Sequence, residues 1–304
     1  MGKRAFLFPG QGSQFVGMAK DLFDNSVEAK EMIKTADGAI GANLSHIMFY
    51  GPEEELKQTE NTQPAIFIHS VVLNSLIRTL DCKGAAGHSL GEYSALVAAG
   101  AMQYFDAINL VRFRGKAMQQ AGIDNPGTMA AVIGLSAEAI EEVCKKASSE
   151  GIVQPANFNS PGQIVVSGSI NGVRKAMEIA KESGAKLVKE LVVSGAFHSP
   201  LMQPAKDKLA VELEKANIYD ARFPVYANVT AKPVTSKDEI RKLLLEQVTL
   251  PVRWEETILN MVNDGFDEFY EIGPGSVLQG LVKRIVPGVK VSCIDSYQKV
   301  SEFL

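Results

Sequence analysis

Residues 87–91 (GHSLG) constrain the fold more than any other stretch of the chain. They have the form G-x-S-x-G, in which a serine occupies a sharp turn between a strand and a helix and exposes its hydroxyl. Glycines suit this turn because the backbones approach closely and the dihedral angles exclude most side chains. Residues 83–86 predict a short buried strand before the turn, and residues 92–99 predict a helix after it. Taken alone, the pattern leaves open whether Ser89 is catalytic or part of a glycine-rich structural turn.

The length and composition favour one globular protein of the α/β class. The 304 residues suffice for one large α/β domain, or for a large domain with a small insert. Hydrophobic residues make up 46% and charged residues 22%, as in ordinary soluble proteins. The net charge of −4, without any basic tract, argues against nucleic-acid binding.

The cysteines and the N-terminus bear on location. Cys82, Cys144 and Cys293 are scattered without metal-ligand spacing, so we expect free thiols, no metal site and a reducing compartment. The apolar run of residues 5–8 stops at Pro9, which is too short for a signal peptide, and no run approaches membrane-spanning length. We therefore predict a cytoplasmic protein without a membrane segment.

A change of pattern after residues 122–127 (GIDNPG) indicates a second domain. Strand-like and helix-like segments follow in the order β-α-β-β-α-β up to residue 193, which is the ferredoxin-like arrangement. We predict an inserted domain over residues 125–195. The larger α/β domain then comprises residues 1–124 and 196–304.

Several segments of the larger domain have definite predictions. Residues 4–8 predict a strand, and the glycine-containing loop after it is either a ligand-facing loop or a simple turn. Residues 65–80 predict a buried helix with proline near its start. Asp106 is the expected N-cap of a helix that runs to Ala121. Residues 185–193 and 223–229 predict strands.

A serine nucleophile needs a base, which is usually histidine, and the chain holds four histidines. His88 adjoins Ser89 and should point away from its hydroxyl, while His46 and His69 lie in helical segments. His198 lies in a loop at the predicted domain junction, so elimination favours it. A long segment follows His198, which fits the usual order of lipases and esterases poorly.

Arg112 and Arg114 lie two residues apart on a predicted helix and therefore face different directions. At most one of them points along the side of the Ser89 turn. Considered without other motifs, Arg114 would be read as a surface arginine paired with an acid.

Seven motifs together resemble the malonyl-CoA:acyl-carrier-protein transacylases of fatty-acid synthesis, over essentially the whole chain. In chain order they are residues 8–14 (FPGQGSQ), 62–65 (TQPA), 87–92 (GHSLGE), 112–115 (RFRG), 157–163 (NFNSPGQ), 195–198 (GAFH) and 271–275 (EIGPG). The resemblance implies an α/β-hydrolase-like large domain with a parallel sheet, interrupted by the ferredoxin-like insert. It places the active site in the cleft between them.

The resemblance also implies residue roles. Ser89 matches the nucleophile, His198 its base, and the backbone N–H groups of Gln11 and Leu90 the oxyanion hole. Gln247 matches the residue whose backbone carbonyl orients the histidine. Arg114 matches the arginine that holds the malonyl carboxylate.

The resemblance further implies the lining of the acyl cleft and the partners. Gln63 and Asn159 resemble residues of that cleft, and Phe197 would form a bulky wall beside the acyl α-carbon. Malonyl-CoA and an acyl carrier protein, with its phosphopantetheine thiol, are the implied partners of a monomeric enzyme without a cofactor. Lys283 and Arg284 are candidates for a basic patch that meets the acidic carrier protein.

Three alternatives remain open at this point. A free-standing acyltransferase that serves a polyketide synthase shares all these motifs. A serine thioesterase or hydrolase would let water attack the acyl-enzyme, which an anion-binding arginine disfavours. A non-catalytic binding protein on the same fold would not need Ser89, His198 and Arg114 together.

Overall fold

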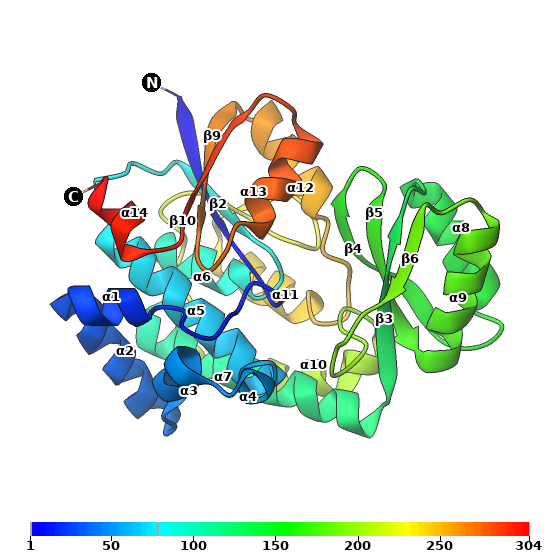
Figure 1. Cartoon of the computed structure of the whole chain (residues 1–304), viewed down its shortest axis with the longest axis horizontal. Helices are drawn as coiled ribbons and strands as arrows, with labels where there is room; N and C mark the ends of the chain where they lie inside the picture. The colour runs from blue at the N-terminus through cyan, green and yellow to red at the C-terminus, as the bar shows by residue number, and fades with distance from the viewer. Residues whose placement is uncertain (1, 78, 304) are drawn as a thin grey trace.

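The computed structural model describes residues 2–77 and 79–303, and its larger part is built on a six-stranded sheet (Figure 1). The strand order is β10-β9-β1-β2-β7-β8, and all neighbours pair in parallel except β7 and β8, which pair antiparallel. The strands are β1 (Lys3–Phe8), β2 (Gly84–Gly87), β7 (Val225–Tyr226), β8 (Pro233–Val234), β9 (Phe266–Ile272) and β10 (Lys290–Ile294).

Helices cover both faces of this sheet, as a parallel sheet requires. They are α1 (Lys20–Asn25), α2 (Val27–Ile40), α3 (Leu44–Tyr50), α4 (Glu53–Leu56), α5 (Thr59–Leu76), α6 (Gly91–Ala98), α7 (Tyr104–Asp124), the 3-10 helix η1 (Pro200–Met202), α10 (Gln203–Lys215), α11 (Lys237–Glu246), α12 (Trp254–Asn263), α13 (Val277–Ile285) and α14 (Tyr297–Ser301). None of the helices among the described residues is long and apolar enough to cross a membrane.

The central strand β1 shows how the sheet sorts its side chains between two cores. Successive residues of a strand point to opposite faces. Phe6 and Phe8 pack in the core that contains α5, α6 and α7, whereas Ala5 and Leu7 pack in the core with α12 and α13. Burying each large side chain contributes about 1.5–3 kcal/mol, which holds the sheet between its two helical layers.

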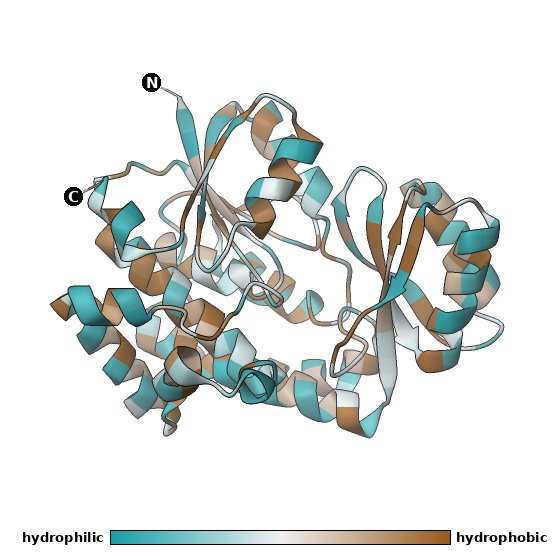
Figure 2. Cartoon of the chain, viewed as in Figure 1, coloured by the Kyte–Doolittle hydropathy of each residue, from teal (hydrophilic) through white to brown (hydrophobic). Residues whose placement is uncertain are grey.

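The smaller part is a four-stranded antiparallel sheet of order β4-β5-β3-β6, with α8 and α9 on its outer face (Figure 1). Its elements are β3 (Gly127–Ile133), α8 (Ala137–Ala147), β4 (Val153–Ser160), β5 (Gln163–Ser169), α9 (Ile170–Glu182) and β6 (Leu187–Glu190). In Figure 2 both the strands and the two helices of this part carry polar residues beside apolar ones. The apolar sides of both helices pack on the sheet, and together they form a core that is separate from those of the larger part.

The predicted α/β class is confirmed, and the elements of the smaller sheet follow the predicted order β-α-β-β-α-β. The domain boundaries at residues 125 and 195 stay a prediction. Strand β4 also bonds to the larger part: the Phe158 N–H donates to the Val252 carbonyl at 2.9 Å, and the Val252 N–H donates to the Ala156 carbonyl at 2.8 Å. Strand β4 and the segment before α12 therefore meet along a short backbone contact.

Helix α5 begins earlier than predicted and contains Pro64 in its interior. Proline has no N–H, so the carbonyl of the residue four positions before it, Glu60, loses its helical donor. The Arg112 guanidinium donates to that carbonyl and also to Asn61 Oδ1, the latter at 2.7 Å. Arg112 thus supports the helix at Pro64. The helix ends at Leu76 rather than at the predicted Leu80.

Four other predictions differ from the structure. Helix α7 starts at Tyr104 after Gln103, so Asp106 lies in the first turn and is not the N-cap. The strands predicted over residues 185–193 and 223–229 shrink to β6 and β7, because only their central residues find a pairing partner. Helix α12 was not predicted at all.

Candidate active site

The turn at Ser89 lies between β2 and α6, at the carboxyl end of the parallel sheet, where α/β proteins bind ligands. Ser89 has a φ of 50°, a left-handed conformation that is rare for a residue with a side chain. A Cβ on Gly87 would lie 1.9 Å from the Gly91 carbonyl carbon, and one on Gly91 would lie 2.0 Å from the Phe8 carbonyl oxygen. Gly87 is therefore required for the close approach of the start of α6 to the end of β2, and Gly91 for the packing of the turn against the end of β1.

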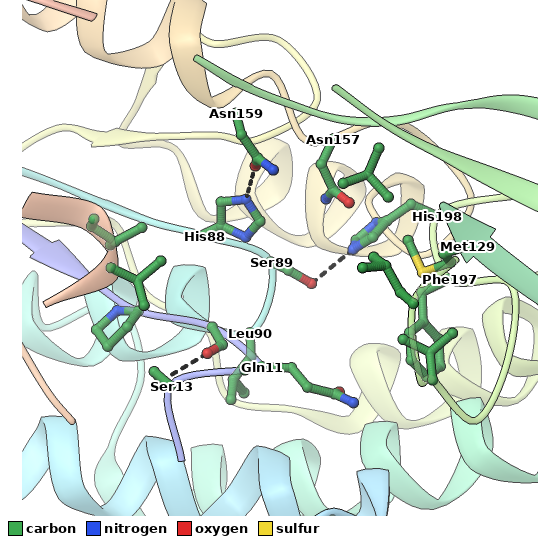
Figure 3. Close-up of a pocket in the computed structure, with 18 of the residues that line it drawn as sticks. Gln11, Ser13, His88, Ser89, Leu90, Met129, Asn157, Asn159, Phe197 and His198 are labelled. Atoms are coloured by element: carbon green, nitrogen blue, oxygen red, sulfur yellow. Dashed lines mark hydrogen bonds between the residues drawn. The ribbon is translucent and has the colours of Figure 1, made fainter. Parts of the chain in front are cut away.

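The structure brings Ser89 and His198 together although 109 residues separate them. The distance from Ser89 Oγ to His198 Nε2 is 2.8 Å (Figure 3), and His198 Nδ1 lies 2.8 Å from the Gln247 carbonyl oxygen. Because a carbonyl oxygen only accepts, Nδ1 carries the proton and Nε2 presents its lone pair to the serine hydroxyl. Burial and then the Arg114 charge lower the pKa of His198 to about 3, so the imidazole is neutral at pH 7.

Two backbone N–H groups near Ser89 point to a third part of the site. Gln11 follows β1 and Leu90 follows Ser89, and β1 and β2 are neighbours that end side by side at Phe8 and Gly87. Within residues 2–77 and 79–303, no hydrogen bond engages the backbone N–H of Gln11 or Leu90. Figure 3 shows both residues next to Ser89. The arrangement suits a developing oxyanion.

Arg114 is buried at 1% exposure, and its hydrogen-bond partners are neutral. Its Nη1 donates to Gln63 Oε1 at 2.7 Å, and its Nη2 donates to Gln247 Oε1 at 2.9 Å and to Ser89 Oγ at 3.2 Å. Its guanidinium also lies 5.5 Å from the centre of the Tyr93 ring. Burial lowers its pKa from the usual value. No carboxylate of a described residue comes within ion-pair distance of it, so a cation without a direct counter-charge faces the nucleophile.

A cavity of about 270 Å³ opens above Ser89. The residues predicted to line it, Gln63, Asn159 and Phe197, do line it, together with Met129 from β3 and Leu281 from α13. Its walls thus come from both parts of the chain. Among the described residues, no group of acidic, histidine or cysteine side chains could hold a metal ion.

The other three histidines lie away from the serine hydroxyl. The His88 ring faces β4, where its Nε2 lies 2.8 Å from Asn159 Oδ1, and not the Ser89 hydroxyl (Figure 3). His69 is buried in α5, where its Nε2 lies 3.2 Å from the Asp295 carbonyl oxygen. His46 is in α3, and the centre of its ring lies 5.2 Å from that of the Tyr50 ring, with the two planes tilted. The choice of His198 agrees with this geometry.

Sequence reasoning missed two polar residues of the site. Asn228 Oδ1 accepts the Ser89 N–H at 2.7 Å, and Asn228 Nδ2 donates to the Gly87 carbonyl at 2.6 Å, which braces the strained turn from both sides. Glu92 accepts the Asn228 N–H at 3.0 Å and Gln247 Nε2 at 2.8 Å. Burial raises the pKa of Glu92 to about 7, although these two hydrogen bonds act to lower it. No local sequence signal marks Asn228, and Glu92 was predicted only as the last residue of the motif at residues 87–92, without a role of its own.

A serine on a strand-to-helix turn, a neutral histidine beside it and two free N–H donors define a serine-dependent acyl-transferring enzyme of the α/β class. The buried Arg114 adds a guanidinium, the group that matches a carboxylate with two parallel hydrogen bonds.

The comparisons with known proteins agree with this class. The chain matches the acyl transferase domain family over residues 5–299. It is 46% identical to the malonyl CoA-acyl carrier protein transacylase of Bacillus subtilis, covering 99% of this chain and 96% of that protein. It is 45% identical to the protein of the same name from Haemophilus influenzae, covering 100% of both. The chain belongs to the acyl transferase domain family, and the predicted resemblance to the malonyl-CoA:acyl-carrier-protein transacylases is confirmed.

Solved structures extend the similarity to the whole fold. The malonyl CoA-acyl carrier protein transacylase from Coxiella burnetii matches with a TM-score of 0.96 at 39% identity, covering 99% of this chain and 96% of that one. A malonyl-transacylase in complex with a type II polyketide-synthase acyl-carrier protein matches with a TM-score of 0.96 at 41% identity, covering 99% of both chains.

Proposed function

We propose that the protein transfers a malonyl group from malonyl-CoA to the phosphopantetheine thiol of an acyl carrier protein, through a malonyl ester on Ser89. One observation carries the proposal: the buried Arg114, without a carboxylate partner among the described residues, donates to the hydroxyl of Ser89. A guanidinium fork matches a carboxylate with two parallel hydrogen bonds, which lysine cannot do. Malonyl-CoA places such a carboxylate two carbons from the thioester carbonyl.

The residues of the site divide the reaction into two half-reactions. His198 Nε2 removes the Ser89 proton as Oγ attacks the thioester carbon, and the Gln247 carbonyl holds the imidazolium that forms. The N–H groups of Gln11 and Leu90 bind the tetrahedral oxyanion, for which the loss of one donor typically costs roughly 10²–10³ in rate. His198 then protonates the departing CoA sulfur. The carrier-protein thiol, deprotonated by His198, attacks the malonyl ester in the reverse sequence and restores Ser89.

Other parts of the proposal rest on the same site. The reaction needs no cofactor, since CoA leaves as a product and phosphopantetheine arrives on the carrier protein. We infer a cytoplasmic, monomeric enzyme of fatty-acid synthesis. Gln63 would hold Arg114 in place, and Asn159 would support the cavity wall through His88. Hydrolysis is less well supported, because Arg114 selects an anionic acyl group.

The proposal is tested by mixing the wild-type protein briefly with malonyl-CoA and measuring its intact mass. We expect one malonyl group per chain without carrier protein, on the peptide that contains Ser89. Adding the carrier protein with its phosphopantetheine should then remove the label and produce malonyl carrier protein. A label on another peptide, or no label at all, would refute the proposal.

Phe197 lines the cavity next to His198, and only 6% of its surface is exposed. We propose that its ring limits the space at the acyl α-carbon. Phe197→Ala should therefore raise the ratio of kcat/KM for methylmalonyl-CoA over malonyl-CoA by roughly 10- to 200-fold, the range for one methyl group in an apolar pocket. Phe158, which is partly buried and packs against the core of the smaller part, offers a control, because Phe158→Leu should leave the ratio unchanged. An unchanged ratio in Phe197→Ala would show that the Phe197 ring does not limit the space at the acyl α-carbon.

A further inference from the structure

Glu92 is a buried carboxyl group that the proposed mechanism does not use. It lies in the first turn of α6, three residues after Ser89, and only 3% of its surface is exposed. Both of its N–H donors, the backbone of Asn228 and Nε2 of Gln247, meet the same oxygen, Oε2. Burying a carboxyl group is unfavourable unless its partners compensate. Glu92 therefore has partners that connect it directly to the site.

The partner that matters is the side-chain amide of Gln247, which has one acceptor end and one donor end. Its Nε2 donates to Glu92 Oε2 at 2.8 Å and to the Ser89 carbonyl at 3.0 Å, and Asn228 Oδ1 is a more distant acceptor at 3.4 Å. Its Oε1 accepts Arg114 Nη2 at 2.9 Å. Glu92 Oε2 acts as an acceptor, so the group of the Gln247 amide that faces it must be the NH₂ group, which donates. The oxygen end then has to face Arg114.

We propose that Glu92 is a positioning residue that orients Arg114 toward the substrate carboxylate through the amide of Gln247, and that it thereby contributes to the selection of anionic acyl groups. The inference rests on the proposed function. His198 depends on the backbone carbonyl of Gln247, whereas Arg114 depends on its side chain. Disturbing the amide alone should therefore affect Arg114 much more than the base.

The test compares kcat/KM for malonyl-CoA and acetyl-CoA in Glu92→Ala and Glu92→Gln. In Glu92→Ala a buried N–H of Gln247 loses its acceptor, and we expect malonyl transfer to fall by roughly 5- to 150-fold, the size of effect for an unsatisfied buried donor. Acetyl transfer should fall much less, because acetyl has no carboxylate for Arg114 to hold. In Glu92→Gln the amide oxygen can replace Oε2 as the acceptor, so the malonyl-to-acetyl ratio should return to within a few-fold of wild type.

Glu271 offers a matched control for purely structural effects. It is also a buried glutamate that accepts two backbone N–H groups, those of Leu278 at 3.0 Å and Gln279 at 2.7 Å, and burial raises its pKa to about 7 as well. Its hydrogen bonds cap α13 and do not involve Arg114. Glu271→Ala should reduce stability and leave the malonyl-to-acetyl ratio unchanged.

The outcomes separate this inference from the proposed function. Equal losses for the two thioesters in Glu92→Ala, or a Glu92→Gln variant as unselective as Glu92→Ala, would overturn the inference. If Glu92→Ala does not fold, Gln247→Leu removes the same amide and keeps the backbone carbonyl; an unchanged ratio there would also overturn it. Failure of the wild-type protein to form a malonyl ester would instead refute the proposed function itself.

Discussion

Ser89→Ala should abolish malonyl labelling of the protein and lower transfer to the carrier protein by roughly 10⁴-fold or more. Without Oγ the malonyl ester cannot form, so the carrier-protein thiol has no acyl-enzyme to attack, and only binding and the oxyanion-hole donors remain, as in other serine enzymes that lose their nucleophile. His198→Ala should cause a loss of similar size, because Ser89 would then keep its proton. The measurement is the rate of malonyl carrier protein formation, together with the intact mass of each variant after exposure to malonyl-CoA.

Ser94 is the matched control for the serine substitution. It lies on α6, the helix that follows the Ser89 turn, and it is fully buried. Its hydroxyl has no hydrogen-bond partner among the described residues. Ser94→Ala should retain labelling and transfer within a few-fold of wild type. If Ser89→Ala still became malonylated, or if both serine variants lost activity equally, Ser89 would not be the acceptor of the acyl group.

Arg114→Ala should lower kcat/KM for malonyl-CoA by roughly two to three orders of magnitude. Breaking a buried ion pair from one side costs about 3–5 kcal/mol, and each 1.4 kcal/mol corresponds to about tenfold in rate. Acetyl-CoA brings no carboxylate, and the substitution also removes an uncompensated guanidinium from its path. Acetyl transfer should therefore hold steady or rise, and the preference between the two thioesters should narrow or invert.

Arg112 supplies the control on the same helix. It lies two residues before Arg114 and holds Glu60 and Asn61 at the start of α5, away from Ser89. Arg112→Ala should lower the free energy of unfolding and affect both thioesters alike. Equal losses for malonyl-CoA and acetyl-CoA in Arg114→Ala would show that Arg114 supports the fold or binds CoA, and malonyl selectivity would need another explanation.

Local patterns predicted the elements whose packing follows the chain itself. The apolar run in β1 is typical of a short buried strand, and the glycines around Ser89 are typical of a strand-to-helix turn. The two amphipathic helices of the smaller sheet repeat apolar residues at the helical period. The predictions failed where distant segments override local propensity. Pro64 lies inside α5 because Arg112 satisfies the carbonyl that proline leaves free, and the strand predicted over residues 223–229 is short because β2 offers only two pairing positions.

The sequence by itself predicted the class of fold and the serine on its turn, and elimination among the histidines favoured His198 as the base. Only the tertiary structure decided where the side chains of Arg114 and Glu92 lie. Arg114 and Arg112 have the same chemistry, and the turn of α7 directs one toward Ser89 and the other against α5. Glu92, Asn228 and Gln247 are far apart in the chain and meet at Ser89 because α6, the segment after β7 and the end of α11 converge there. A hydrogen bond depends on position and direction in space, and residue spacing along the chain specifies neither for segments that fold from a distance.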